Sequence, residues 1–210
     1  MDLNIWLAFV AASAALIVIP GPTILLVLSY ALSRGRQVAV GTALGVALGD
    51  FVAMTASLAG VGTLVLASAT LFSILKWAGA AYLMWMGIKL WRSAPTGGLT
   101  ILEGKADAET RSVFGHAALV TALNPKSIAF FIAFVPQFIR PNEALLPQFS
   151  ILIATYVTLG ALSALIYALL AGHMRDWIAK PAAIRALTRT GGAALIGMGL
   201  FTAFLRRPTA

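Results

Sequence analysis

The 210-residue chain contains no cysteine and only two histidines, His116 and His173, which lie far apart in the sequence. Without cysteine the chain cannot form disulfides or carry out thiol redox chemistry, and it lacks the ligand clusters of transition-metal sites. No serine, histidine and acid combination suited to nucleophilic catalysis occurs, and no glycine-rich phosphate-binding loop. We therefore expect no metal and no cofactor, and we expect neither an enzyme nor a protein that hydrolyses ATP.

Charged residues are also scarce, at 10% of the chain, whereas 60% of the residues are hydrophobic and the mean hydropathy is +0.92. Soluble domains usually contain about 25% charged and about 45–50% apolar residues, so this composition indicates an integral membrane protein. The formal net charge is +8, but the basic residues lie between apolar blocks and form no soluble basic face. We interpret them as determinants of topology that contact lipid headgroups, and we expect no nucleic-acid partner.

The apolar residues form about six segments that are long enough to span a membrane, since a spanning helix needs about 20 residues to cross about 30 Å of hydrocarbon. The first segment follows Asp2 directly and is too long for a cleaved signal peptide. The predicted spans cover residues 5–28, 38–66, 71–91, 113–138, 145–171 and 184–205. A basic linker with Arg175, Lys180, Arg185 and Arg189 lies around the start of the last span. The sequence therefore predicts an all-α membrane protein.

Lysine and arginine are distributed unequally between the predicted connections. With six spans, the connections after the first, third and fifth span lie on one side of the membrane. That side carries Arg34, Arg36, Lys89, Arg92, Lys105, Arg111, Arg175, Lys180, Arg185 and Arg189, and the other side carries Arg140, Arg206 and Arg207. The positive-inside rule places the first side in the cytoplasm and both termini outside. Five spans would bring Arg206 and Arg207 inside as well, so the charges alone slightly favour five spans.

Internal repetition favours six spans. Each half of the chain contains three apolar segments, and proline interrupts the first segment of each half. We predict a first three-helix repeat over residues 1–92, a polar cytoplasmic linker over 93–112, and a second three-helix repeat over 113–210. Because three is an odd number, the second repeat enters the membrane inverted. Inverted repeats with interrupted helices are typical of secondary transporters, whose binding sites lie near the midplane where the repeats meet.

Pro20-Gly21-Pro22 interrupts the first predicted span. Proline removes an amide donor and clashes with the preceding turn, so we expect the helix to end here and a second one to begin. A half-helix that begins near Pro22 points its amide end into the membrane centre, where it attracts a carboxylate. A structural kink without a ligand agrees equally well with this motif.

Asn124-Pro125-Lys126 interrupts the fourth predicted span. Asparagine is a favourable N-cap and proline is favoured at the first helical position, so a half-helix can begin here. A lysine at this depth costs roughly 2.5–3.5 kcal/mol, and such a residue is usually functional or paired. The alternatives for Lys126 are a salt bridge with Asp50 and a side chain that extends to the headgroups.

Asp50 is the only acidic residue well inside a predicted span. The protonation of a buried carboxyl depends on whether the site is hydrated, and proton-coupled transport needs this property. A structural salt bridge to Lys126 or Lys76 is the alternative. Glycines at four-residue spacing precede Asp50 and allow close helix packing, within the protein or in a homodimer. They are Gly41, Gly45 and Gly49.

Tyr156 begins a series of residues on one face of the fifth predicted span. The series is Tyr156, Gly160, Ser163 and Tyr167. Its hydroxyl groups either line the substrate path or hydrogen-bond to neighbouring helices, and the spacing alone does not distinguish the two.

Several of these segments occur in an order that points to a known family. They are Pro20-Gly21-Pro22, the glycines before Asp50, residues 76–83 with Gly87, Phe114-Gly115, Asn124-Pro125-Lys126, Phe130-Phe131 and Pro136-Gln137-Phe138. Together they resemble the lysine exporter / homoserine-threonine exporter (LysE/RhtB) family. The resemblance implies six helices in two inverted repeats in a bacterial inner membrane, and export of amino acids or derivatives driven by protons. The family often has asparagine before the first Pro-Gly-Pro, where this chain has Ile19.

These observations lead to one leading hypothesis about function, a proton-coupled amino-acid exporter. The candidate substrate-binding residues are Pro20, Gly21, Pro22, Thr23, Asn124, Pro125, Lys126 and Tyr156, and Asp50 is the candidate proton-handling residue. The substrate's carboxylate is expected at the amide ends of the half-helices beside Lys126, and its amino group at carbonyls freed by the breaks. A neutral amino acid, or a derivative such as homoserine or threonine, is favoured because only one acid lies within a span. The alternatives are a transporter or channel for another small solute or ion, and a structural membrane subunit.

Overall fold

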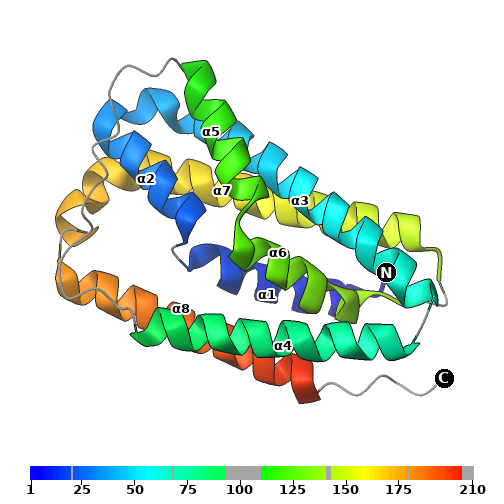
Figure 1. Ribbon diagram of the computed structural model, residues 1–210. Helices are drawn as coiled ribbons and strands as arrows, with labels where there is room; N and C mark the ends of the chain where they lie inside the picture. Colours follow the sequence, from blue (N-terminus) through cyan, green and yellow to red (C-terminus); the bar gives the residue numbers. More distant parts are fainter. Residues whose placement is uncertain (20, 68, 93–109, 141–142, 179, 205–210) are drawn as a thin grey trace.

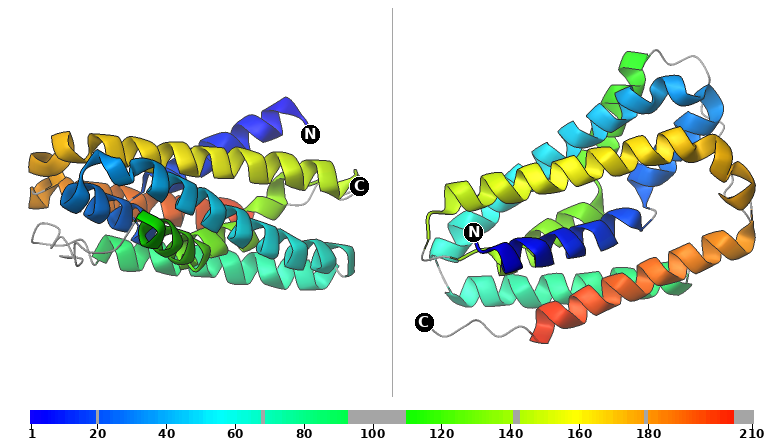
Figure 2. Two further views of the ribbon diagram at one scale, coloured as in Figure 1. Left: turned by 90° about the horizontal axis from the view of Figure 1, so that it is seen from above. Right: turned by 180° about the vertical axis from the view of Figure 1, so that it is seen from behind.

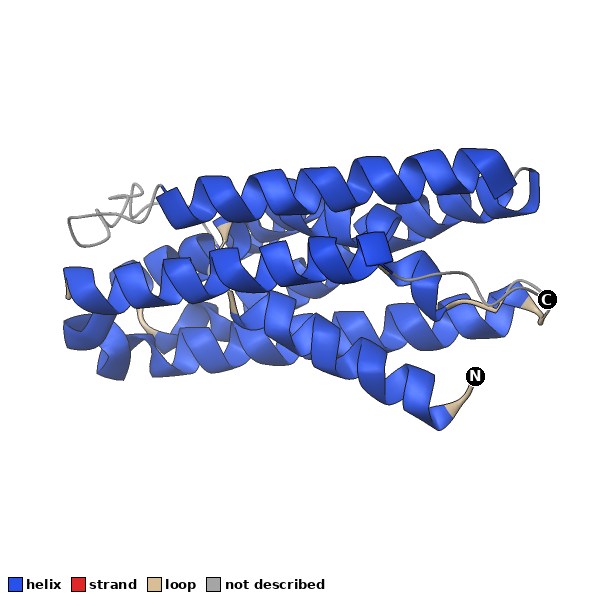
Figure 3. Cartoon of the chain, turned by 90° about the horizontal axis from the view of Figure 1, so that it is seen from below, coloured by secondary structure: helices blue, strands red, loops and turns tan. Residues whose placement is uncertain are grey.

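The computed structural model describes residues 1–19, 21–67, 69–92, 110–140, 143–178 and 180–204. Within this part of the chain the elements are helices joined by short loops (Figure 3). Several residues used in the sequence predictions lie outside the described residues: Pro20, Lys105, Arg206, Arg207 and residues 93–109 of the predicted linker.

Both spans that were predicted to be interrupted consist of two helices each. α1 (Leu3–Val18) and α2 (Pro22–Arg34) are bent relative to each other by 54°. α5 (Thr110–Ala122) meets α6 (Pro125–Ala133) at a bend of 44°, and the 3-10 helix η2 (Val135–Phe138) extends α6. We call the junction of α1 with α2 the first break and the junction of α5 with α6 the second break. The prediction of two interrupted helices is confirmed.

The other predicted spans are continuous helices. α3 (Ala39–Ala67) follows a short 3-10 helix, η1 (Arg36–Val38), and α4 is Ala69–Arg92. In the second half, α7 is Leu145–Ile178 and α8 is Pro181–Phe204.

The predicted basic linker is wrong at Arg175, which lies in α7. Arg185 and Arg189 lie in α8, as the predicted last span from residue 184 implies. The chain after Ala171 contains no proline before Pro181, so nothing in the sequence ends α7 where its apolar stretch ends. Pro181 then occupies the first position of α8, where its missing amide costs no hydrogen bond.

Among the described residues, two helical stretches are long and apolar enough to cross a membrane, Arg36–Gly62 and Leu145–His173. The number rises to four if each bent pair forms one span. The described residues of α4 and α8 do not meet this criterion, although each helix has 24 residues. At the usual rise per residue this is about 36 Å, which exceeds the hydrocarbon thickness. A total of six spans therefore stays a prediction.

The helices are packed side by side along one long direction, and corresponding parts of the two halves run in opposite senses (Figures 1 and 2). The bent pair α1–α2 runs opposite to the bent pair α5–α6, α3 runs opposite to α7, and α4 runs opposite to α8. α3 contacts α7, and α4 contacts α8. The N-terminus and the C-terminal end of α8 therefore face the same end of the bundle.

The two ends of the bundle differ in charge. Arg34 is the last residue of α2, Arg36 is the first of η1, and Arg92 is the last of α4. These termini all lie at the same end of the bundle (Figure 1). At the other end, Arg140 forms ion pairs with Asp2, at 3.6 Å, and with Glu143, at 3.0 Å. The hydrogen bond and negative charge of Glu143 raise the pKa of Arg140 above its ordinary value. The more basic end corresponds to the predicted cytoplasmic side.

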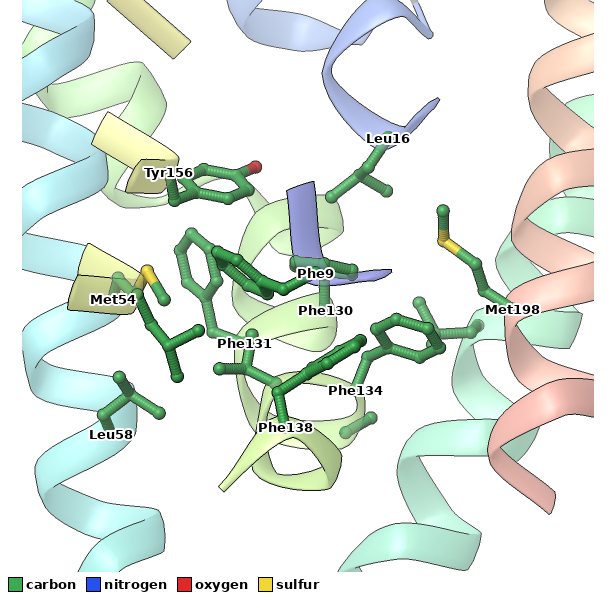
Figure 4. Close-up of a cluster of buried hydrophobic side chains, with 14 of the residues drawn as sticks. Phe9, Leu16, Met54, Leu58, Phe130, Phe131, Phe134, Phe138, Tyr156 and Met198 are labelled. Atoms are coloured by element: carbon green, nitrogen blue, oxygen red, sulfur yellow. The ribbon is translucent and has the colours of Figure 1, made fainter. Parts of the chain in front are cut away.

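An aromatic core fills the part of the bundle around α6 and η2 (Figure 4). Phe130, Phe131, Phe134 and Phe138 are buried, and Phe9 of α1 packs edge-on against Phe138 with ring centroids 5.4 Å apart. Because a helix that is buried on several sides needs apolar residues all around, these phenylalanines hold α6 in the centre of the bundle.

Gly45 and Gly49 allow close contact between α3 and α5. A Cβ atom at Gly49 would lie 2.6 Å from the Thr121 Cβ, and one at Gly45 would lie 2.8 Å from the Ala117 Cβ. Real Cβ atoms do not approach so closely, so only glycine fits. For Gly45 and Gly49 the prediction of close helix packing is confirmed, with α5 as the partner helix, and the role of Gly41 stays a prediction.

A second glycine contact, which the sequence patterns did not predict, lies between α4 and α8. A Cβ atom at Gly87 would lie 2.6 Å from the Gly192 carbonyl oxygen, and one at Gly192 would lie 2.7 Å from the Gly87 carbonyl oxygen. The two backbones therefore touch at this crossing. Small residues give membrane helices their closest packing, and this contact joins the last helix of each half.

Candidate functional site

The two breaks lie next to each other in the middle of the bundle, where α2 and α6 begin (Figure 1). Pro125 is the first residue of α6, and the Asn124 side chain accepts a hydrogen bond from the Lys126 amide at 3.1 Å. Pro22 is the first residue of α2, and Gly21 is its N-cap in an extended conformation. Gly21 has no side chain to cap the amides of the first turn of α2. Asn124, Pro125, Gly21 and Pro22 thus begin the half-helices as predicted.

Lys126 extends from the second break into the first. Its Nζ donates hydrogen bonds to the carbonyl oxygens of Leu16, at 3.0 Å, and Ile19, at 2.8 Å. A Cβ atom at Gly21 would lie 3.3 Å from the same Nζ. The ammonium group therefore lies between the carbonyl end of α1 and the amide end of α2, and only 8% of Lys126 is exposed.

Thr23 makes the reciprocal contact, from the first break to the second. Its Oγ1 accepts a hydrogen bond from the Asn124 Nδ2 at 3.1 Å and one from the Thr121 Oγ1 at 3.3 Å. Thr23 follows Pro22 as Lys126 follows Pro125. The residue after the proline in each break therefore contacts the other break. The side chains involved, those of Thr23, Thr121, Asn124 and Lys126, are all buried.

Tyr167 on α7 hydrogen-bonds to the C-terminal end of α1. Its hydroxyl donates to the Val18 carbonyl at 3.0 Å. The last carbonyls of a helix have no partner within that helix, and in hydrocarbon an unpaired carbonyl costs several kcal/mol. Tyr167 thus satisfies the Val18 carbonyl and Lys126 satisfies the Ile19 carbonyl. The Leu16 carbonyl accepts from Lys126 and also from the Ile19 amide, at 3.3 Å.

Asp50 is buried between α3 and α7. A Cβ atom at Gly160 would collide with the Asp50 Oδ2, so the carboxyl occupies the space that this glycine leaves. Asp50 is close enough to Lys126 for the two charges to interact, yet the ion pairs found in the described part of the chain are those of Arg140. The predicted alternative of an Asp50–Lys126 salt bridge is therefore wrong in this conformation, because the carbonyls of α1 bind the ammonium instead.

Tyr156 lies one helical turn before Gly160 and is only 2% exposed. Its ring packs edge-on against Phe131 at 4.7 Å, and its hydroxyl lies near the Ser127 side chain. Figure 4 shows this hydroxyl pointing away from the phenylalanines and toward the region of Leu16. Tyr156 therefore forms the boundary between the aromatic core and the polar residues of the breaks.

Sequence reasoning missed Thr121 and Ser127, and it expected a role for carbonyls freed by the breaks without identifying those of Leu16 and Ile19. Thr121 lies one turn before Asn124, and Ser127 directly follows Lys126, so their spacing was a usable signal. The roles of the carbonyls could not be read from side-chain types. The predicted binding and proton-handling roles of the other residues stay predictions.

The sequence profile of the LysE type translocator family matches residues 5–205, which is nearly the whole chain. The chain belongs to the LysE type translocator family. Membership in this family, together with the long apolar helices, identifies an all-α membrane protein that acts as a transporter rather than an enzyme.

Several relatives align with most of the chain. An uncharacterized membrane protein of Vibrio cholerae is 33% identical over 97% of this chain and 98% of its own length. A homoserine/homoserine lactone efflux protein of Salmonella typhimurium is 34% identical over 98% of this chain and 99% of its own length. A leucine efflux protein of Salmonella choleraesuis is 33% identical over 65% of this chain and 64% of its own length. No solved structure matches the chain.

Proposed function

We propose that this LysE-family protein is a secondary transporter that exports a neutral amino acid, or a derivative such as homoserine or threonine, in exchange for protons. Full-length similarity to a homoserine/homoserine lactone efflux protein, and partial similarity to a leucine efflux protein, support this substrate class. The observation that carries the proposal is the burial of Lys126 and Asp50 where the two interrupted helices meet. Ionisable residues in membrane helices are costly and are retained mainly for function.

The substrate's carboxylate is assigned to the first turn of α2. No side chain caps this turn, and the positive end of the helix dipole favours an anion. In this conformation the Lys126 ammonium lies near Gly21, so its positive charge also attracts an incoming carboxylate. At the second break, Asn124 already caps the Lys126 amide, so we expect the carboxylate at α2 rather than at α6.

The substrate's side chain is assigned to an open groove of about 400 Å³ between α1 and α8, which we call the α1–α8 cavity. Ile19 lines this cavity, and its carbonyl binds Lys126. The other lining residues are Ala14, Ala15, Val18, Thr190, Gly191 and Ala194. An apolar lining with one hydroxyl residue suits a neutral side chain better than a charged one.

Asp50 is assigned to proton exchange. A carboxyl takes up or releases a proton when its site opens to water on one side of the membrane, and a buried carboxyl responds most strongly to such opening. Because Asp50 faces the α7 backbone at Gly160, sliding of α3 against α7 would change its exposure.

We also propose that the halves are inverted repeats, one over residues 1–92 and one over 113–210, in a bacterial inner membrane with both termini in the periplasm. The reciprocal contacts of Thr23 and Lys126 support this symmetry. In transporters built this way, one repeat rocks against the other around a central site, which would expose Asp50 and the breaks to each side in turn.

Transport into everted membrane vesicles tests the proposal. Vesicles containing the protein are energised to acidify their interior, and uptake of labelled amino acids is compared between wild type and Asp50→Asn. We expect uptake of one or a few neutral amino acids, which a protonophore abolishes. Asp50→Asn should reduce this uptake to the level of empty vesicles while retaining exchange of labelled for unlabelled substrate without a gradient.

Glu143→Gln is the matched control, because it makes the same carboxyl-to-amide change at an exposed residue at the end of the bundle. It should transport like wild type. If no amino acid enters vesicles that contain folded protein, the proposal of an amino-acid exporter is wrong. If gradient-driven uptake persists in Asp50→Asn, the exporter stands and the role of Asp50 is wrong.

A further inference from the structure

The contacts of Lys126 point to an internal competitor for the substrate. We propose that the carbonyls of Leu16 and Ile19 form the binding site for the substrate's ammonium group, and that Lys126 occupies this site while no substrate is bound. The inference rests on the proposed amino-acid export and adds which group of the substrate binds there and what it must displace. We call the two oxygens the carbonyl pair.

The carbonyl pair has the chemistry of an ammonium site. Both oxygens belong to the C-terminal end of α1, where the helix dipole is negative and favours cations. A lysine ammonium and the ammonium of an amino acid each carry three N–H donors on one compact charge. The distances of 3.0 and 2.8 Å to the Lys126 Nζ show that the oxygens are spaced for such a group.

The carbonyl pair is also adjacent to the places assigned to the rest of the substrate. A Cβ atom at Gly21, the N-cap of α2, would lie 3.3 Å from the Lys126 Nζ, and Ile19 lines the α1–α8 cavity. An amino acid whose carboxylate meets α2 therefore carries its ammonium to the position that Lys126 now holds. Both ammonium groups cannot bind the pair at once.

Asp50 is a second possible partner for the Lys126 ammonium. The Lys126 side chain is a flexible four-carbon stem, and the Asp50 carboxyl lies within electrostatic range. When the substrate's ammonium takes the carbonyl pair, Lys126 moves toward Asp50, and the buried cation keeps a charged partner. The same movement links the occupied state of the site to the residue that is proposed to handle the proton.

Binding to the purified full-length protein in lipid nanodiscs tests this inference. The probes are L-leucine, L-homoserine and any amino acid transported in the vesicles, each paired with its acid lacking the amino group, such as 4-methylpentanoate and 4-hydroxybutanoate. The ratio of the two Kd values in a pair reports the contribution of the amino group. In Lys126→Met this ratio should rise about tenfold or more in favour of the amino acid, because the internal competitor is gone.

Gly21→Ala provides a second variant that keeps Lys126. The new Cβ would lie 3.3 Å from the Cε and 3.7 Å from the Cδ of Lys126, so it crowds the lysine stem, which the substrate lacks, and destabilises the binding of Lys126 to the carbonyl pair. The extended backbone of Gly21 is accessible to alanine, so the change does not strain the chain. It should raise the ratio in the same direction by a smaller factor. Gly62→Ala is the matched control, since its Cβ would lie 3.2 Å from the Phe149 ring, away from the breaks, and it should leave the ratio unchanged.

The outcomes are distinguishable. If amino acid and acid weaken together in Lys126→Met and their ratio stays constant, Lys126 contacts only the carboxylate and the inference is wrong. If Lys126→Met does not fold, an unchanged ratio in Gly21→Ala overturns the inference. If the vesicles transport an amino acid and the ratio does not respond, only this inference falls. If no amino acid is bound or transported, the proposed function falls with it.

Discussion

At the scale of single residues, the buried polar side chains of the breaks satisfy one another across the two halves of the chain. Lys126 binds the carbonyl end of α1, and Asn124 both caps α6 and donates to Thr23. In a medium without water, a polar group that loses its partner keeps the full cost of its burial. Each of these side chains therefore supports the position of another.

The link between Thr23 and Asn124 leads to a prediction about stability. Thr23→Val removes the acceptor at nearly constant shape, and Asn124→Ala removes the donor together with the cap, which alone is worth about 1 kcal/mol. The double variant should be less destabilised than the sum of the two single variants, by about 1 kcal/mol, because the bond between them can be lost only once. Unfolding of the purified protein in mixed micelles, followed by tryptophan fluorescence, measures this coupling.

Thr42→Val is the control for this cycle. Thr42 is also fully buried, but its hydroxyl bonds to carbonyls of its own helix turn, Val38 and Ala39. The loss of stability caused by Thr42→Val should therefore add to the loss caused by Asn124→Ala. Additive effects for Thr23→Val and Asn124→Ala would show that their hydrogen bond contributes nothing to stability.

At the scale of helices, close backbone contacts determine which elements can move. Gly45 and Gly49 bring α3 against α5, and Gly87 and Gly192 bring α4 against α8. Without a hydrophobic driving force between helices in lipid, such contacts supply much of the association energy through van der Waals packing. The pairs α3–α5 and α4–α8 each join the two halves, so any relative motion of the halves must act at these glycines.

Gly49→Ala should separate α3 from α5 near the second break. The added Cβ would lie 2.6 Å from the Thr121 Cβ and 2.9 Å from the Ala122 amide nitrogen, so the backbones must shift. Overpacking of this kind typically costs about 1–3 kcal/mol. We expect a lower melting temperature in detergent and reduced uptake in vesicles, since Thr121 also donates to Thr23.

Gly115→Ala on α5 is the corresponding control. A Cβ atom at this position would meet nothing within 4 Å. The variant should keep the melting temperature and transport of wild type. Equal melting temperatures for Gly49→Ala and Gly115→Ala would contradict the role given to the α3–α5 contact.

At the scale of the whole molecule, each end of the bundle has its own polar contacts between the halves. At the basic end, Tyr30 of α2 hydrogen-bonds to His116 of α5 at 2.8 Å, and Arg36 hydrogen-bonds to His173 of α7 at 3.4 Å. At the other end, Arg140 pairs with Asp2, and Trp6 of α1 donates to Thr155 of α7. The site between them is buried in this conformation. Transport would require the contacts at each end to open in turn.

The absence of cysteine makes the orientation of the bundle directly testable. Ser33→Cys places a thiol at the basic end, and Glu143→Cys places one at the opposite end; both positions are exposed. In intact bacterial cells, a maleimide that cannot cross the inner membrane should label Glu143→Cys and should label Ser33→Cys only after the cells are opened. The parent chain supplies the control without a thiol. The reverse pattern would place the basic end in the periplasm and contradict the proposed orientation.

The sequence by itself determined the class of protein, the helices and the positions of the breaks. These properties depend on local chemistry: apolar length decides where a membrane helix can form, and proline decides where it is interrupted. The residues at both breaks, the glycine packing of α3 and the burial of Asp50 followed from such patterns. The end of α7 did not, because a helix continues past its apolar stretch until a residue such as Pro181 stops it.

Only the tertiary structure decided which groups meet. Lys126 could be assigned to Asp50, to the headgroups or to a ligand from its sequence position, and the fold placed it on the carbonyls of Leu16 and Ile19. Backbone carbonyls are present at every residue, so the sequence does not mark the ones that a broken helix leaves without partners. Which of them bind a cation depends on how the second half of the chain packs against the first, and that is a property of the folded molecule alone.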